Sequence, residues 1–172
     1  MLRVLGTIKY SPFASQFSDE TNQLTDWVIE IHDAMFKHLP STGIFYNYAN
    51  NASSFPDGAS TAIVASTVYR LVVLTGEGAG NVPSAERARN ALYANNGQDH
   101  FDQNGWLTPV VDPMTFTQEG KESPEGQAFI LQLDNAWNEW KQAGSKSGAI
   151  RFALSPSMVI SGVLLTIAMW IL

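Results

Sequence analysis

The chain has 172 residues, which is enough for one domain with a moderate core and too few for two full domains. Its formal net charge is −6, and its 10 lysine and arginine residues are scattered, so the basic surface typical of nucleic-acid-binding proteins is missing. The absence of cysteine excludes disulfides, thiolate metal ligands and a cysteine nucleophile. We therefore expect no nucleic-acid partner and no cofactor.

The first residues predict a short helix that ends before Pro12. Leu2, Leu5 and Ile8 recur every three residues, as on one face of a helix. The apolar stretch is too short for the apolar region of a secretory signal. We expect a structural helix here, and no secretory signal within this chain.

A second helix is predicted over residues 18–38. Ser18 can cap its first turn, and Pro40 forces the chain out of the helix. Spacings of three and four then predict a single buried face, made of Leu24, Trp27, Val28, Ile31 and Met35.

Two groups of residues resemble metal ligands only superficially. His32, Asp33 and His38 meet no known ligand spacing, so we expect solvated or capping side chains there. Asp102 to Gly105 begins like a calcium loop, but the twelfth position is Pro113 rather than a bidentate glutamate. The segment predicts a turn with a left-handed glycine, and we expect no metal site.

The middle of the chain predicts a loop followed by two helices. Residues 41–58 are rich in Asn, Ser, Gly and aromatic residues, which is typical of a surface loop. Residues 60–74 are apolar on nearly every side, so they predict a helix buried between layers. Residues 84–94 predict a shorter helix that starts after Pro83. In the loop we expect exposed aromatic rings at Phe45, Tyr46, Tyr48 and Phe55.

The remaining soluble part predicts a long ordered loop and a last helix. Residues 95–122 show no convincing strand pattern, but they hold too many large apolar residues for a solvated linker. Ser123, Pro124 and Glu125 form a strong helix start, and Gly144 is expected to end that helix. The pattern predicts an all-α fold of helical hairpins.

Three segments carry a family resemblance: TGIFYNYANNASSFPDGASTAIVASTVYRL, GWLTPVVDP and SPEGQAFILQLDNAWNEW. In order and spacing they resemble fungal six-hairpin glycosidase-like proteins, which are related to unsaturated rhamnogalacturonyl and glucuronyl hydrolases. The resemblance covers about residues 1–143. It implies a partial (α/α)6 barrel that corresponds to the C-terminal half of the family fold.

The resemblance also implies where sugar chemistry could lie. Family members use an aspartate from the earlier half of the barrel as general acid, and no segment here matches it. Of the carboxylates present, Asp57 and Glu125 are the best candidate pair, but both occupy positions where helix caps and first-turn anions are preferred regardless of function. Family members tend to place a polar aromatic or a histidine at the position of Tyr46. Candidate sugar contacts are Tyr46, Asn47, Tyr48, Phe55, Trp106 and Gln127.

The C-terminus predicts attachment to a membrane. Residues 144–157 form a small-residue and polar spacer, and residues 158–172 form an apolar tail. This order is typical of a glycolipid (GPI) anchor signal with attachment at Ser147 or Ser145, while a retained transmembrane helix is the alternative. Asn51 begins a glycosylation acceptor sequence, which suits a secretory route.

The sequence therefore favours the C-terminal part of a cell-surface glycoside hydrolase-like protein. It is expected to act on polysaccharide or oligosaccharide and to be inactive alone. The alternative is a non-catalytic carbohydrate-binding or membrane-anchored interaction protein. In either case the expected partners are carbohydrate and, through the tail, a membrane with the protein on its extracellular face.

Overall fold

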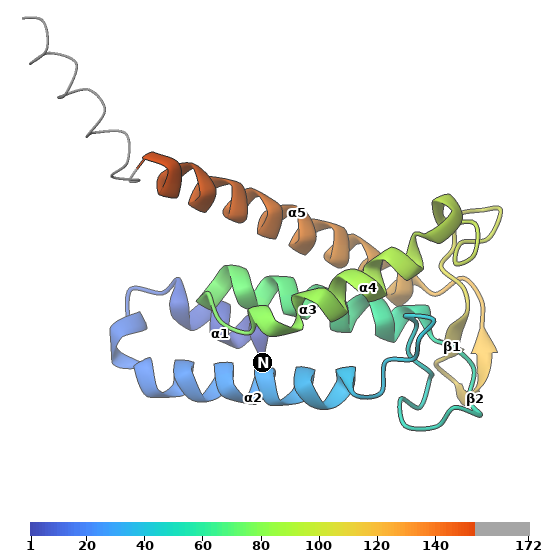
Figure 1. Ribbon diagram of the computed structural model, residues 1–172. Helices are drawn as coiled ribbons and strands as arrows, with labels where there is room; N and C mark the ends of the chain where they lie inside the picture. Colours follow the sequence, from blue (N-terminus) through green and yellow to red (C-terminus); the bar gives the residue numbers. More distant parts are fainter. Residues whose placement is uncertain (154–172) are drawn as a thin grey trace, which may run out of the picture. The chain divides into compact units, whose positions relative to one another are not determined.

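The computed structural model describes residues 1–153, and the side-chain surroundings of residues 1–144. Residues Met1–Trp140 form one compact unit, and the chain is mostly helical (Figure 1). Its elements are α1 (Leu2–Lys9), η1 (Ala14–Gln16), α2 (Ser18–Phe36), α3 (Gly58–Thr75), η2 (Ala79–Asn81), α4 (Val82–Leu92), η3 (Ala94–Gly97), β1 (Val110–Asp112), β2 (Thr115–Gly120) and α5 (Pro124–Ala153).

The first two helices form an antiparallel hairpin that packs against α3 (Figure 1). Leu5 of α1, Val28 of α2 and Leu71 of α3 meet in one small apolar cluster. The expected capping role of Ser18 is wrong, because the N-cap residue is Phe17 and no side chain caps the helix. Thr21 instead donates its hydroxyl to the Phe17 carbonyl at 2.7 Å.

The buried face of α2 differs from the predicted one. Thr25, Val28 and His32 are its buried residues, whereas Trp27 and Ile31 keep 47% and 45% of their surface exposed. Apolar spacing gave the correct helix but the wrong centre of its buried face. Nothing within the described residues covers Trp27 and Ile31 fully.

Helix α3 lies at the centre of the compact unit and contacts α1, α2 and α4. Its sequence predicts burial on all sides, and residues from every turn are buried. Asp57 caps its first turn, and Gly76 ends it with a left-handed φ of 81°.

Helix α4 packs along α3 and completes the larger core. Pro83 stands in its first turn, as predicted, and Ala85, Ala88 and Leu92 form its buried stripe. The core they join also contains Phe45, Tyr69, Leu107, Val110 and Leu133. Phe45 is only 1% exposed, so the expected exposed ring at this position is wrong.

The segment between α4 and α5 is ordered, but it contains strands that the sequence did not predict. β1 and β2 pair antiparallel with an irregularity between Val111 and Asp112. The strands are short, and β2 is exposed along most of its length, so no alternating apolar pattern marks it. The turn predicted at Asp102 is confirmed, since its Oδ1 accepts the N–H groups of Asn104 and Trp106 and Gly105 has a φ of 83°.

Helix α5 begins as predicted and continues further than predicted. The Ser123 hydroxyl accepts the Gly126 N–H at 3.0 Å, which confirms its capping role. Ile130, Leu133 and Ala136 face the core. Gly144 does not end the helix, because one glycine costs only about 1 kcal/mol and no proline occurs before Pro156.

Candidate functional site

Backbone pairing joins the two ends of the loop that precedes α3. Tyr46 pairs with Pro56, and the Asn47 N–H donates to the Phe55 carbonyl at 2.8 Å. The Asn47 side-chain amide donates to the Phe116 carbonyl of β2 at 2.6 Å. Three of the predicted sugar contacts, Tyr46, Asn47 and Phe55, are thereby brought together beside the β-hairpin.

Gln127 fixes the second loop, which carries Trp106. Its Oε1 accepts the Leu107 N–H at 3.0 Å, and its Nε2 donates to the Gly105 carbonyl at 2.8 Å. Both functions of the amide are therefore used within the protein. Trp106 is half-buried between these two anchored residues.

The two loops meet at the N-termini of α3 and α5. The Gly58 N–H donates to the Pro109 carbonyl at 2.8 Å. The Leu107 side chain lies so close to Gly58 and Gly126 that a Cβ there would approach it to 3.1 and 3.4 Å. We call this region the loop end: residues 44–58, 100–120 and 123–127. All six predicted sugar contacts lie in the loop end. Tyr48 is the most exposed of the aromatic candidates, at 45%.

The two candidate carboxylates have different surroundings within the loop end. Asp57 is 4% exposed, and its oxygens accept the N–H groups of Ala59 at 3.2 Å and Ser60 at 3.1 Å. It therefore serves as the N-cap of α3, a role that typically contributes about 1 kcal/mol. Glu125 is exposed and accepts the Ser123 hydroxyl at 3.3 Å.

A groove that the sequence did not indicate lies between α1, α3 and α5. Its volume is about 870 Å³. The Arg70–Glu139 ion pair stands at its edge, and Gln132 and Asn135 expose their side-chain amides there. No predicted sugar contact lines it. On α3 and α5 the lining residues have the spacing of one helix face. Any packed helix shows this spacing, so the sequence alone does not mark the groove.

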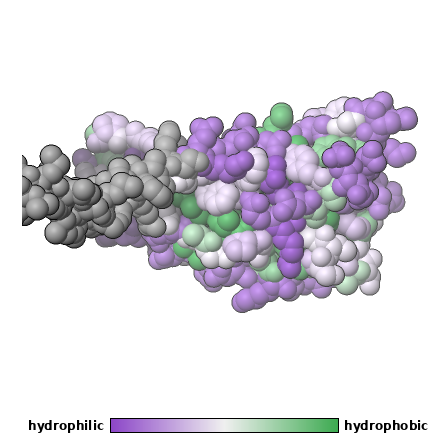
Figure 2. All heavy atoms as spheres, turned by 45° about the horizontal axis from the view of Figure 1, so that its top comes forward, coloured by the Kyte–Doolittle hydropathy of each residue, from purple (hydrophilic) through white to green (hydrophobic). Residues whose placement is uncertain are grey.

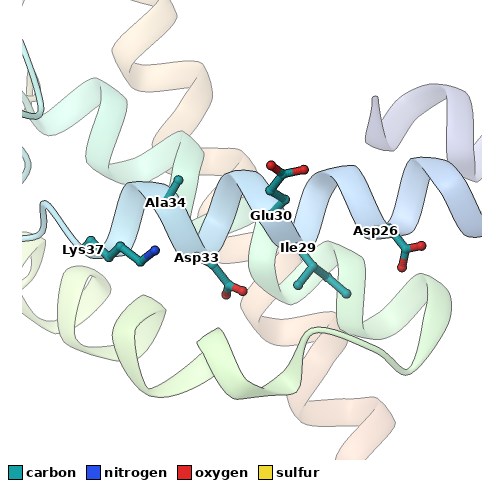
Figure 3. Close-up of a pocket in the computed structure, with 6 residues that line it drawn as sticks. All are labelled: Asp26, Ile29, Glu30, Asp33, Ala34 and Lys37. Carbon is teal, nitrogen blue, oxygen red and sulfur yellow. The ribbon is translucent and has the colours of Figure 1, made fainter.

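A second, smaller hollow lies along α2 (Figure 3). It measures about 430 Å³ and is lined by Asp26, Ile29, Glu30, Asp33, Ala34 and Lys37. Figure 3 shows that these side chains leave one helix in different directions, with Glu30 on the side away from Asp26 and Asp33. Asp33 also accepts the Asn81 amide at 2.7 Å. This hollow has the character of a solvated helix surface.

A polar cluster joins α3, α4 and α5. Glu86 Oε1 accepts the Tyr69 hydroxyl at 2.7 Å and the Trp137 indole N–H at 2.9 Å. The Arg89 guanidinium lies 3.7 Å from the centre of the Trp137 ring. Burial and the hydrogen bond to Glu86 raise the pKa of Tyr69 above its usual value. The cluster therefore holds a neutral tyrosine against a carboxylate.

The same cluster extends one turn along α4 and α5. The Tyr93 hydroxyl donates to Asp134 at 2.9 Å, and burial together with this bond raises the pKa of Tyr93. Arg89 also lies 5.1 Å from the centre of the Tyr93 ring. Because its hydrogen bonds and the contact of Arg89 with Trp137 join different helices, we assign the cluster a packing role.

His32 is buried rather than solvated, contrary to expectation. It is 3% exposed, and its Nε2 lies 2.9 Å from the Thr67 hydroxyl. That hydroxyl already donates to the Val64 carbonyl, so it accepts from the histidine, and Nδ1 is left without a partner. Burial lowers the pKa of His32 to about 4, against a smaller opposing effect of Asp33.

The predicted modification sites differ in how far the structure describes them. Asn51 is exposed, and its Oδ1 accepts the Ser53 N–H at 3.0 Å in a tight turn. Ser145 and Ser147 fall within the range of α5. The apolar tail, residues 158–172, lies outside the described residues.

Comparison of the chain with known protein families, curated proteins and solved structures found no match. Within the described residues, one helix, α3, is long and apolar enough to cross a membrane. More than half of its apolar window is buried inside the protein, which a core helix equally explains.

Proposed function

We propose that this chain is a non-catalytic, carbohydrate-binding helical module related to the six-hairpin glycosidases, attached to the outer face of a membrane through its C-terminal tail. In this proposal its hairpins correspond to part of an (α/α)6 barrel. The loop end corresponds to the end of that barrel at which sugar binds.

The observation that carries the proposal is the convergence of the sugar-contact candidates at the loop end. Two loops, far apart in the sequence, are joined there by the hydrogen bonds of Asn47 and Gly58, and Gln127 holds the second loop to the start of α5. Because these hydrogen bonds already hold the loops that carry Tyr48 and Trp106, the loops lose little conformational entropy when a ligand binds. Aromatic rings of this kind can stack on the apolar face of a pyranose ring.

The surroundings of the carboxylates favour binding over hydrolysis. Glycosidic cleavage by the common route needs two carboxyl groups roughly 5 to 9.5 Å apart, one of them able to hold a proton. Both carboxylate oxygens of Asp57 already accept backbone N–H groups as the N-cap of α3, so they are occupied within the protein. Glu125 alone cannot supply both roles, so we expect the module to lack hydrolytic activity of its own.

The test uses the full chain in nonionic detergent on an array of plant and fungal cell-wall oligosaccharides. We expect binding that weakens about tenfold in Tyr48→Ala and Trp106→Ala, because each loses a stacking surface. Tyr10→Ala is the matched control, since Tyr10 is exposed just after the end of α1, outside the loop end. Absence of binding to every glycan would overturn the proposal.

The same preparation tests for catalysis. Unsaturated uronyl disaccharides and cell-wall oligosaccharides should show no turnover above the buffer rate. Turnover that disappears in Asp57→Asn or Glu125→Gln would place a catalytic carboxylate in this chain and contradict the non-catalytic assignment.

A membrane-anchored interaction protein is the second candidate. The exposed apolar residues of the first two helices favour it, because large apolar side chains that gather on a surface usually mark a contact with a partner.

A further inference from the structure

The outer side of the α1–α2 hairpin carries apolar residues that the protein does not cover. Val4 on α1 and Trp27 and Ile31 on α2 are 54%, 47% and 45% exposed. They share this side with Met1, which is exposed, and with Ile8 and Leu24, which are half-buried. We call these six residues the α1–α2 face.

Helical geometry makes the face continuous. Met1, Val4 and Ile8 are three to four residues apart and follow one side of α1, next to buried Leu5. Leu24, Trp27 and Ile31 do the same on α2, next to buried Val28. The two helices are antiparallel neighbours (Figure 1). Because Leu5 meets Val28 between them, we infer that the two stripes lie along the same contact.

On the side of the molecule that Figure 2 shows, hydrophilic and intermediate residues cover most of the surface, and hydrophobic residues appear in smaller areas between them. The α1–α2 face is a candidate contact surface because its large apolar side chains are exposed or half-buried. Contiguous exposed apolar patches larger than a few hundred Å² are uncommon on soluble monomers.

Charge divides the two helices of the hairpin. Helix α1 carries Arg3 and Lys9 and no acidic residue. Helix α2 carries five acidic residues and no lysine or arginine. None of these charged side chains forms an ion pair with another described residue. The ion pair of the described residues joins Arg70 and Glu139. The two helices of the hairpin thus carry charges of opposite sign.

We propose that the α1–α2 face is a homodimer interface, in which a two-fold axis parallel to the helices places α1 of one copy over α2 of the other. Both apolar stripes are then covered by their equivalents. Each basic helix opposes an acidic one, so Lys9 approaches the first turn of α2, with Glu20, in the other copy. A two-fold axis across the helices would instead place α2 on α2, where like charges repel.

The oligomeric state of the full chain, measured in nonionic detergent by sedimentation with detergent density matching, tests this interface. The unmodified protein should be dimeric at micromolar concentration. Trp27→Lys should weaken association at least about tenfold, because it buries an unpaired charge at the centre of the face. Leu131→Lys is the matched control, since Leu131 is 64% exposed on α5, outside the face. A monomeric parent protein, or a Trp27→Lys variant that stays dimeric, would overturn the proposal.

Charge exchange tests the arrangement of the two copies. Lys9→Glu and Glu20→Lys should each weaken the dimer, and the double variant should restore it. Failure of the double variant to recover above either single variant would contradict the pairing of α1 with α2.

Site-directed cross-linking tests the arrangement without disturbing the apolar residues, because the chain has no native cysteine. Lys9→Cys chains mixed with Glu20→Cys chains should form disulfide-linked dimers faster than Lys9→Cys chains alone. Lys121→Cys, on an exposed lysine outside the face, should cross-link slowly in either mixture. Equal rates for the mixed and unmixed chains would overturn the proposed axis.

Discussion

At the scale of single residues, burial decides the chemistry of the groups that the sequence leaves open. The sequence predicts a solvated side chain at His32. In the structure this side chain is buried against α3, with Nε2 bonded to the Thr67 hydroxyl and Nδ1 without a partner. Asp57 reads as a catalytic candidate, yet both of its oxygens cap α3. In both cases the neighbouring helix, rather than the residue type, sets the role.

His32 predicts an acid sensitivity of the fold. Its pKa in the folded protein, about 4, lies below the ordinary value of 6.5. Protonation therefore favours the unfolded chain, so stability is fully present above about pH 6.5 and falls as the pH drops toward 4. The complete loss from this group amounts to about 3 kcal/mol. Urea unfolding at a series of pH values between 7 and 4.5 measures most of this loss.

The control for this prediction is a second histidine. His32→Gln should flatten the pH dependence between 6.5 and 4.5, because glutamine does not titrate. His38→Gln is the matched control substitution, at an exposed histidine. If the free energy of unfolding of the parent protein and of His32→Gln changed with pH in parallel, the acid sensitivity could not be assigned to His32.

At the scale of elements, α5 is held to the rest of the compact unit by polar as well as apolar contacts. Glu86 links Tyr69 of α3 and Trp137 of α5, and Tyr93 of α4 bonds Asp134. The buried residues Leu133 and Ala136 fill the space beside this cluster. Polar contacts of this kind fix the register of one helix against another, because each donor has one matching acceptor.

Glu86→Leu should destabilise the protein by about 3 kcal/mol, since the Tyr69 hydroxyl and the Trp137 N–H lose their common acceptor. Thermal or urea unfolding measures this loss. Tyr69→Phe combined with Glu86→Leu should cost less than the sum of the single changes, because the two side chains share one bond. Glu77→Leu, at an exposed position, is the matched control. Strict additivity would show that the bond does not couple the two helices.

At the scale of the whole molecule, the predicted attachment to a membrane concerns the apolar tail, residues 158–172, beyond the described residues. A signal-peptide fusion expressed in fungal cells should yield surface protein that a phosphatidylinositol-specific phospholipase releases, as expected for a glycolipid anchor. Surface protein that resists the enzyme and retains Leu172 by mass spectrometry would establish a transmembrane helix instead.

The six sugar-contact candidates lie at one end of the helices, but the groove between α1, α3 and α5 contains none of them. The sequence does not predict the groove, because ordinary helix faces line it. The groove exists only because α1, α3 and α5 lie apart from one another at this place in the folded chain.

The sequence by itself determined where most helices lie. Ser123 and Pro124 marked the start of α5, Asp57 and Gly76 bracket α3, and the all-round apolar character of residues 60–74 predicted its central position. These signals are local: caps, proline and periodicity act within a few turns of the chain. For the same reason they say little about contacts between distant segments.

Only the tertiary structure decided which side of each helix is buried and which residues share a site. Trp27 and Ile31 fit a buried apolar face in sequence, but α2 turns Thr25 and His32 toward α3 instead. The short β-strands and the Glu86 cluster likewise depend on partners far along the chain. Such pairings are set by packing and long-range hydrogen bonds, which leave no periodic trace in the sequence.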